Sequence, residues 1–467
     1  MLLRDFKIQL FNEDFNIKKI LEEIIHIQGQ EDAFYVVDID DLVKKHKNWC
    51  DKLPRVQPFY AVKCNDTQAM LEILAALGVG FDCASKAEIQ KVKSLGVSSD
   101  RIIYANPCKT NSYIRYAASQ GVTCMTFDNA TELYKIKQNF PSAELVLRIR
   151  CDAKEAQCPL GSKFGAIPSA VPELLTVARE LGLNLIGVSF HVGSGCADVT
   201  AYSNAISSAK EVFTMAAHMG FQFRLLDLGG GYPGHHNHGF PTFDQLADSI
   251  NDALDEHFPR GCGVRIIAEP GRYYVSSAFT LATCVIAKRE VLNDTSQGTM
   301  YYTNDGVYGS FNCLLYDHAA VQMKSLKEYQ EKDWCMPSSI WGPTCDSLDC
   351  ILKRVLMPSM DVGDWLYWPN MGAYTCSAAS TFNGFPRPEF HYVASEFTWS
   401  YLADLLAVCF HEDVEASSVD EDLAACLKLP SPSATLRILS IETTTTPSEN
   451  DIETETLLPI ELLTIAS

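Results

Sequence analysis

The sequence predicts an α/β protein made of a (β/α)₈ barrel followed by an all-β sheet domain. Between residues 58 and 274, short apolar runs alternate with stretches of helical periodicity, and this repeated switch favours a parallel α/β fold. Glycines and polar residues directly follow several of the apolar runs, as they do at the carboxyl ends of barrel strands. After about residue 278 the pattern changes to short strands and turns, which indicates the second domain.

The expected barrel strands are apolar or β-branched runs bounded by turn residues. In chain order they lie within Pro58–Lys63, Gly80–Ala84, Ile102–Asn106, Cys124–Asp128, Leu145–Ile149, Val188–Gly195, Phe223–Leu228 and Ile266–Tyr274. Helical patterns separate them, as in Thr67–Leu77 and Pro172–Leu181. Met300–Thr303 and Asp364–Trp368 are typical of the strands expected in the second domain.

The first of these strands ends on Lys63, just before a Cys-Asn turn. Burying an ammonium group is costly unless it is paired or chemically consumed, and Schiff-base formation with an aldehyde consumes it. A solvated lysine at a strand end is the commoner case. The interpretation of Lys63 as a reactive amine therefore depends on the other motifs.

Two further strand ends carry residues suited to a phosphorylated ligand. Gly229, Gly230 and Gly231 follow a buried strand, and a run of glycines can present unobstructed N–H groups to a phosphate. Arg272, in Glu269–Arg272, could bind a phosphate in a bidentate manner. Alone, each motif is more often a simple loop or a solvated ion pair, so their common order along the chain is the informative feature.

In this order the motifs resemble those of the eukaryotic ornithine decarboxylases, which are pyridoxal-phosphate enzymes of the alanine-racemase-like fold. The resemblance runs from about residue 30 to about residue 400 and rests on Lys63, His191–Gly195, Gly229–Gly231, Glu269–Arg272, Cys345–Asp346 and Tyr374.

The resemblance implies pyridoxal 5'-phosphate as the cofactor. Such a cofactor needs a lysine for its aldehyde, a cradle for its phosphate and a carboxylate that keeps its ring nitrogen protonated. Lys63, the triglycine run and Glu269 meet these needs, and the match to His191 stacks on the ring. The implied cofactor-binding residues are Lys63, Asp82, Glu88, Arg148, His191, Ser194, Gly229, Gly230, Gly231, Glu269, Gly271, Arg272 and Tyr374.

The implied reaction is the decarboxylation of an L-amino acid to CO₂ and a primary amine. Its catalytic residues are Lys63, His191 and Cys345, and Cys345 matches the proton donor of the family. We expect the Cys345–Asp346 turn to be buried and to reach the active site of the other subunit, which implies an obligate homodimer with shared sites. The implied substrate-binding residues are Tyr316, Asp317, Asp346 and Phe382.

Three functions stay open at this point. The carboxylates of Asp317 and Asp346 favour ornithine, with putrescine as product, because a buried carboxylate pair is expensive without a cationic partner. Ser347 and Pro159 depart from the residues common in the family, which would suit its paralogue that decarboxylates leucine. The third alternative is a non-catalytic regulator like the antizyme inhibitors, but these lose cofactor ligands that this chain retains.

Antizyme itself is a possible partner. The segment expected to face antizyme has Ser142 and Glu144 where lysines are usual in the family. Losing positive charge should weaken the docking of an acidic partner surface. We therefore expect any antizyme contact to be weakened.

Composition excludes several other classes of protein. The net charge of −20 disfavours nucleic acid and anionic lipid surfaces as partners. The chain shows no apolar stretch suited to a membrane span and no signal peptide, so we expect a cytoplasmic protein with reduced thiols. We interpret His235–His238 as a solvated loop and expect no metal.

The predicted division of the chain has four parts. Residues 1–38 join the sheet domain, residues 39–277 form the cofactor-binding barrel, and residues 278–411 form the β-sheet domain. Residues 412–467 are acidic, rich in Ser and Thr and poor in aromatics, which predicts a flexible tail.

Overall fold

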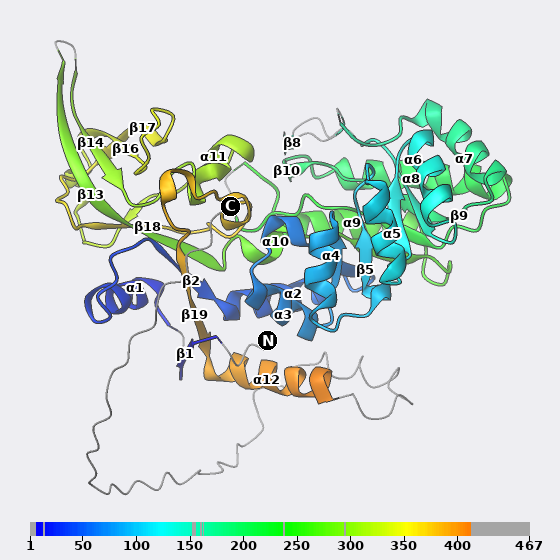
Figure 1. The fold of residues 1–467 in the computed structure, drawn as a ribbon, viewed down its shortest axis with the longest axis horizontal. Helices are drawn as coiled ribbons and strands as arrows, with labels where there is room; N and C mark the ends of the chain where they lie inside the picture. The colour runs from blue at the N-terminus through cyan, green and yellow to red at the C-terminus, as the bar shows by residue number, and fades with distance from the viewer. Residues whose placement is uncertain are drawn as a thin grey trace, which may run out of the picture. The chain divides into compact units, whose positions relative to one another are not determined.

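The computed structural model describes residues 6–12, 15–151, 156–158, 161, 163–236, 239–293 and 296–411 (Figure 1). The predicted tail from residue 412 onward lies outside the described residues. Pro159, one of the two departures from the family, also lies outside the described residues, and so does His238 of the histidine-rich loop His235–His238.

Eight parallel strands close into a barrel, and the predicted fold class is therefore confirmed. Each strand is short and almost fully buried, as expected where helices cover the outside of a parallel sheet. The barrel strands are β3 (Val56–Ala61), β4 (Gly80–Cys83), β5 (Ile102–Tyr104), β6 (Cys124–Phe127), β7 (Glu144–Arg148), β9 (Asn184–Ser189), β11 (Leu225–Asp227) and β12 (Arg265–Ala268).

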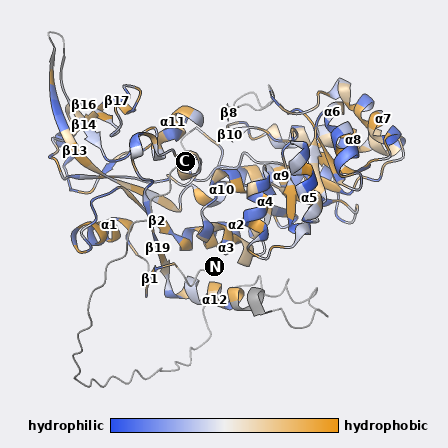
Figure 2. Ribbon diagram, in the orientation of Figure 1, coloured by the Kyte–Doolittle hydropathy of each residue, from blue (hydrophilic) through white to orange (hydrophobic). Residues whose placement is uncertain are grey.

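Helices surround the barrel, and they carry both hydrophobic and hydrophilic residues (Figure 2). Helix α9 shows why: Phe243, Leu246, Ile250 and Leu254 recur at helical spacing and are buried, and a capping box at Thr242 fixes the helix start. The other helices of the barrel are α2 (Ile39–Lys52), α3 (Gln68–Ala76), α4 (Lys86–Lys93), α5 (Asn111–Ser119), α6 (Ala130–Asn139), α7 (Val171–Glu180), α8 (Ala201–His218) and α10 (Arg272–Val275). Helix α9 itself spans Phe243–His257. Among the described residues, no helix combines the length and the apolar character needed to cross a bilayer.

One apolar cluster takes a residue from each of six barrel strands. It consists of Phe59, Ile103, Val146, Ile186, Leu225 and Ile267. Glycines on neighbouring strands make room for it: a Cβ at Gly80 would lie 2.8 Å from the ring of Phe59, and one at Gly187 would meet the backbone of Leu225. The barrel interior is therefore packed with side chains rather than open.

A mixed sheet accompanies the barrel and combines strands from both ends of the described chain. Its strand order is β1-β19-β2-β13-β14-β16-β17, with β18 paired to β13 and β15 paired to β18. The strands are β1 (Ile8–Phe11), β2 (Phe34–Asp38), β13 (Phe279–Asn293), β14 (Ser296–Thr303), β15 (Lys324–Ser325), β16 (Met336–Trp341), β17 (Cys350–Met357), β18 (Trp365–Trp368) and β19 (Glu389–Ser395). Helices α1 (Ile17–His26), α11 (Cys313–Tyr316) and α12 (Glu396–His411) complete this part. The domain boundaries at residues 38, 277 and 411 stay predictions.

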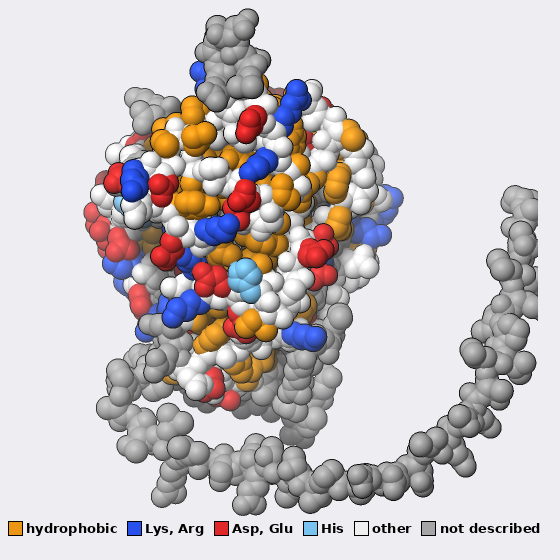
Figure 3. Space-filling model, turned by 90° about the vertical axis from the view of Figure 1, so that its left-hand side faces the viewer, with side chains coloured by type: hydrophobic (Ala, Val, Ile, Leu, Met, Phe, Trp, Pro, Cys, Tyr) orange, Lys and Arg blue, Asp and Glu red, His pale blue; other side chains and the backbone are white. Residues whose placement is uncertain are grey.

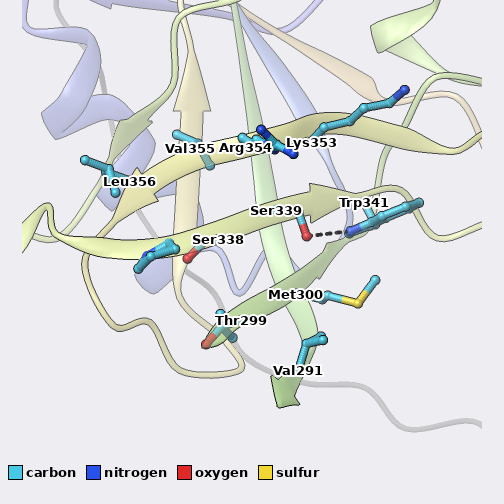
Figure 4. Close-up of a pocket in the computed structure, with 12 residues that line it drawn as sticks. Val291, Thr299, Met300, Ser338, Ser339, Trp341, Lys353, Arg354, Val355 and Leu356 are labelled. Atoms are coloured by element: carbon cyan, nitrogen blue, oxygen red, sulfur yellow. Dashed lines mark hydrogen bonds between the residues drawn. The ribbon is translucent and has the colours of Figure 1, made fainter. Parts of the chain in front are cut away.

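The outer part of this sheet carries an apolar groove. Figure 3 shows the molecule from the end where β13, β14, β16 and β17 lie, and there hydrophobic side chains are interspersed with charged ones. The groove is lined by Val291, Gly298, Thr299, Met300, Pro337, Ser338, Ser339, Trp341, Lys353, Arg354, Val355 and Leu356 (Figure 4). Within it, Trp341 Nε1 donates a hydrogen bond to Ser339 Oγ at 2.8 Å.

Candidate active site

The candidate site lies at the carboxyl ends of the barrel strands and begins with Lys63. The sequence predicts that the strand ends on Lys63. Strand β3 instead ends at Ala61, and Lys63 lies in the 3₁₀ turn that follows it. Hydrogen bonds from Tyr374 N (2.9 Å) and Ser377 Oγ (3.1 Å) to the carbonyl of Cys64 hold this turn. The amine of Lys63 is thereby fixed above the strand end.

Lys63 forms an ion pair with Asp82, which is buried in β4. Burial alone would lower the pKa of Lys63, but the carboxylates of Asp82 and Glu269 reverse this effect, and the pKa is raised. Burial raises the pKa of Asp82, although the charges of Lys63 and Arg148 act in the opposite direction. The amine is therefore protonated in the free protein, paired with Asp82 and stabilised by the charge of Glu269, which follows β12.

Glu88 supports this pair from helix α4. Its Oε2 accepts a hydrogen bond from the backbone N–H of Ala84 at 2.6 Å, directly after strand β4. Burial raises the pKa of Glu88, and the neighbouring charge of Asp82 adds to this. Arg148 lies at the end of β7, and its guanidinium carbon is 5.4 Å from the ring centre of Phe164.

The triglycine run forms a backbone cradle in which side chains have no room. A Cβ at Gly230 would lie 2.8 Å from His191 Nε2, and one at Gly231 would lie 2.6 Å from the carbonyl oxygen of Gly193. Gly229 and Gly231 have φ values of +62° and +117°, which L side chains rarely adopt. The backbone conformation and the close packing both require glycine here.

His191 lies against this cradle in its neutral form. Its Nδ1 accepts a hydrogen bond from the N–H of Gly193 at 3.0 Å, so the ring proton is on Nε2. Burial lowers the pKa of His191 well below the usual value, and the charges of Arg148 and Lys63 lower it further. A neutral ring of this kind can stack on a flat aromatic ligand without adding charge.

Arg272 joins the candidate cofactor residues to a candidate substrate residue. Its Nη2 donates to Ser194 Oγ at 2.9 Å and to the carboxylate of Asp317 at 2.7 and 2.8 Å. Asp317 is 5% exposed and follows helix α11. The guanidinium also lies 5.2 Å from the ring centre of Tyr374, whose φ of +55° is unusual for a residue with a side chain.

These groups line one small cavity. Its walls are Ala61, Lys63, His191, Ser194, Gly230, Gly231, Tyr232, Glu269, Gly271, Arg272 and Tyr374. Most of the predicted cofactor-binding residues are thus brought together. Asp82, Glu88 and Arg148 stand around this cavity, and Gly229 belongs to the cradle.

The remaining predicted residues form a second cluster around Tyr308. The hydroxyl of Tyr308 donates to Asp346, and its ring stacks on Phe382 with centroids 4.5 Å apart. The backbone N–H of Cys345 donates to Asn383 Oδ1 at 3.0 Å. The hydrogen bond to Asp346 raises the pKa of Tyr308, and Tyr316, which is 72% exposed, makes a smaller contribution in the same direction. Cys345 is exposed in the single chain, and its burial against a second subunit stays a prediction.

The sequence analysis missed two residues that shape the cradle. Asp227, the last residue of β11, accepts a hydrogen bond from the N–H of Gly229 at 2.9 Å. Tyr202 of α8 donates to the carbonyl of Gly230 at 3.0 Å and stacks on Tyr232. An acidic residue inside the apolar run Leu225–Leu228 was a usable signal for Asp227, whereas Tyr202 looks like an ordinary helix residue.

In the histidine-rich loop, His235 departs from the solvated position that the sequence predicts. His235 is partly buried, its Nδ1 lies 3.2 Å from Ser276 Oγ, and burial lowers its pKa. Within the described ranges, no group of three or more His, Cys, Asp or Glu side chains is placed to hold a metal ion.

The cavity suits pyridoxal phosphate. It offers an amine for the aldehyde, a cationic guanidinium with a glycine cradle whose space a single Cβ would fill, and a buried carboxylate at Glu269. Fold and site together define a pyridoxal-phosphate-dependent amino-acid decarboxylase of the barrel-plus-sheet type.

Comparisons with known proteins agree. Residues 39–276 match the pyridoxal binding domain of the pyridoxal-dependent decarboxylases. Mouse ornithine decarboxylase is 51% identical over 424 residues, which cover 88% of this chain and 92% of the relative. Antizyme inhibitor 2 of Xenopus laevis is 50% identical over 408 residues, covering 85% and 89%. The structure of arginine decarboxylase from Paramecium bursaria Chlorella virus superposes with a TM-score of 0.76 at 37% identity, over 80% of this chain and all of that one. The chain belongs to the ornithine decarboxylase family.

The glycine cradle yields a first prediction. Gly231→Ala should weaken cofactor binding by about tenfold or more, because a Cβ at this φ would lie 2.6 Å from the carbonyl oxygen of Gly193 and would displace the backbone that forms the cradle. Titration of the apoprotein with pyridoxal phosphate, followed by absorbance, measures the effect. Gly96→Ala is the matched control, because Gly96 also has a positive φ but opens onto free space. Equal affinities for both variants would contradict the assigned cradle.

Proposed function

We propose that this enzyme decarboxylates L-ornithine to putrescine. The observation that carries the proposal is Asp317, a buried carboxylate bonded to Arg272, which lines the cavity. Once Arg272 binds the cofactor phosphate, the buried Asp317 needs another cationic partner, which favours a substrate with a distal ammonium group. The 51% identity to mouse ornithine decarboxylase supports the same substrate.

The positions of the individual residues support the following roles. Lys63 would hold the aldehyde of the cofactor, Arg272 and the glycine cradle would hold its phosphate, and Glu269 would keep its ring nitrogen protonated. His191 would stack on the ring, and Asp82, Glu88 and Arg148 would set the charge around Lys63. When bound, the cofactor supplies an electron-accepting ring for the charge left as CO₂ departs. Ser194, Gly271 and Tyr374 complete the pocket.

The second cluster supplies the other half of the site in a homodimer. Cys345 of one subunit donates the proton to the substrate α-carbon in the site of its partner, and Asp346 joins Asp317 in binding the distal ammonium. Tyr316 and Phe382 border this pocket. The exposure of Cys345, Tyr316 and Phe382 supports the proposal, since a subunit interface would cover all three.

Two alternatives have weaker support. Leucine decarboxylation would depend on the change to Ser347, but this side chain is exposed, and the carboxylates of Asp317 and Asp346 are both retained. A purely regulatory role, suggested by the antizyme inhibitor relative, does not explain why Asp82, Arg148, Ser194 and Arg272 are all retained around the cavity.

Antizyme binding, if present, should be weak. Glu144 forms an ion pair with Arg224 of its own chain, and Ser142 is exposed without a charge. Neither residue offers the cation that would attract an acidic partner surface. We also propose that the enzyme works in the cytoplasm, in polyamine biosynthesis.

The substrate assignment is tested with a panel of ornithine, lysine, arginine and leucine. Putrescine should be the main amine product. Asp317→Asn and Asp346→Asn should each raise the KM for ornithine by roughly 10- to 150-fold, because a hydrogen bond to a charged group is worth about 1.5–3 kcal/mol.

Asp361→Asn serves as the control, since Asp361 pairs with Lys288 on the exposed surface. Cofactor affinity is measured in parallel, because Asp317 also contacts Arg272. Turnover of leucine but not of ornithine by the wild type would overturn the assignment.

A further inference from the structure

Asn65 links the turn that carries Lys63 to the segment that carries Tyr374. It lies two residues after Lys63 and is fully buried. Its side-chain Nδ2 donates a hydrogen bond to the carbonyl of Gly372 at 2.9 Å, across 307 positions of the chain. In the opposite direction, the backbone N–H of Tyr374 donates to the carbonyl of Cys64 at 2.9 Å. The two segments are therefore joined from both sides.

The other end of the Asn65 amide holds the segment that follows the Lys63 turn. Its Oδ1 accepts hydrogen bonds from the hydroxyl of Thr67 and, at 3.0 Å, from the backbone N–H of the same residue. The backbone carbonyl of Asn65 accepts from the hydroxyl of Tyr60 at 2.8 Å. Because the N–H of Thr67 can only donate and the carbonyl of Gly372 can only accept, these two partners fix the orientation of the amide. The position uses the donor and the acceptor of an asparagine side chain together.

The two linked segments contribute residues to opposite functions in one cavity. Lys63 and Tyr374 both line it. Lys63 is the amine assigned to the aldehyde of the cofactor, whereas the ring centre of Tyr374 lies 5.2 Å from the guanidinium of Arg272, which is assigned to the phosphate. Asn65 is not among the residues that line the cavity, so it acts through its neighbours.

We propose that Asn65 is a positioning residue that holds Lys63 and Tyr374 at the spacing that lets one molecule of pyridoxal phosphate engage both ends of the cavity at once. A ligand that engages two groups together binds more tightly than either of its halves, because the second contact forms within the same complex. Loosening the link should reduce this gain and leave the binding of the halves almost unaffected. The inference rests on the roles proposed above for Lys63 and Arg272.

Comparing the whole cofactor with its two halves tests the inference. Asn65→Ala should weaken the binding of pyridoxal phosphate by about tenfold or more, because two buried hydrogen bonds of the link are lost. The same variant should bind pyridoxal, which lacks the phosphate, and inorganic phosphate, which lacks the aldehyde, within about threefold of the wild type. Absorbance of the lysine-bound chromophore measures the first two affinities, and competition with pyridoxal phosphate measures the third. No amino acid is added, so the result is independent of the ornithine assignment.

Asn65→Ser separates the two sides of the link. A serine hydroxyl can still accept the N–H of Thr67, but it is too short to reach Gly372. The Ser variant should therefore show the same selective loss of affinity for the whole cofactor as the Ala variant. Asn304→Ala is the matched control, because Asn304 also joins two segments through both ends of its amide but lies away from the cavity. Its replacement should leave all three affinities unchanged.

Two results would overturn the inference. One is a loss of affinity for pyridoxal or for inorganic phosphate that is as large as the loss for the whole cofactor, which would mean that Asn65 only supports the fold. The other is unchanged binding of pyridoxal phosphate in the Ser variant, which would mean that the bond to Gly372 sets no spacing. If the Ala variant does not fold, the Ser variant still decides the matter.

Discussion

Lys63→Ala should remove both the visible absorption band of the lysine-bound cofactor and the decarboxylase activity. The amine is the nucleophile that the turn after β3 holds at the cavity, and no other lysine lines that cavity among the described residues. Spectra of the purified protein after incubation with pyridoxal phosphate, together with release of CO₂ from labelled ornithine, measure both effects.

Lys63→Arg separates reactivity from charge. Arginine keeps a cation beside Asp82 and preserves the electrostatic balance of the buried carboxylates, but it does not form the covalent link. The Arg variant should fold at least as stably as the Ala variant and should also lack the band. A band that persists in either variant would remove Lys63 from its assigned role.

Cys345→Ala should lower kcat by about 10² to 10⁴, the usual value of proton transfer by a positioned group. Cofactor affinity should change little, because Cys345 lies in the cluster around Tyr308 and not in the cavity. Cys335→Ala is the control, since Cys335 is another exposed thiol in the same part of the chain.

Mixing the two inactive variants tests whether the sites are shared. In a hybrid dimer of Lys63→Ala and Cys345→Ala chains, one site carries both changes and the other carries neither. Equal mixing with free exchange should therefore restore about a quarter of wild-type activity, for a two-fold symmetric dimer. No recovery despite demonstrated exchange of subunits would mean that each chain completes its own site.

The sequence pattern predicted the barrel and three of the motifs around the cavity, whereas the places of His191, Ser194 and Tyr374 came from the resemblance to the family. Lys63, Gly229–Gly231 and Glu269 each follow an apolar strand, and strand ends of a parallel barrel meet on one face. The local pattern and the order of the motifs were therefore enough to predict the positions of these residues.

Contacts between distant segments were beyond such reasoning. The bond from Arg272 to Asp317 joins residues 45 positions apart, and the bond from Tyr308 to Asp346 joins residues 38 apart. Neither pairing has a local sequence pattern. The burial of Cys345 stays a prediction for a different reason, because burial at a subunit interface is a property of two chains.

Tyr374 shows that a strained backbone can be the cost of placing one side chain. With φ at +55°, its backbone has a conformation that costs a residue with a side chain about 1–2 kcal/mol and that glycine adopts freely. The tyrosine ring nevertheless lies over Arg272 and lines the cavity. Glycine at this position would relieve the backbone strain but would remove a ring that packs against the apolar core, which costs about 3–5 kcal/mol for a buried aromatic side chain. The contacts of the ring therefore more than offset the strain, and a substitution chosen from the φ angle alone would destabilise the protein.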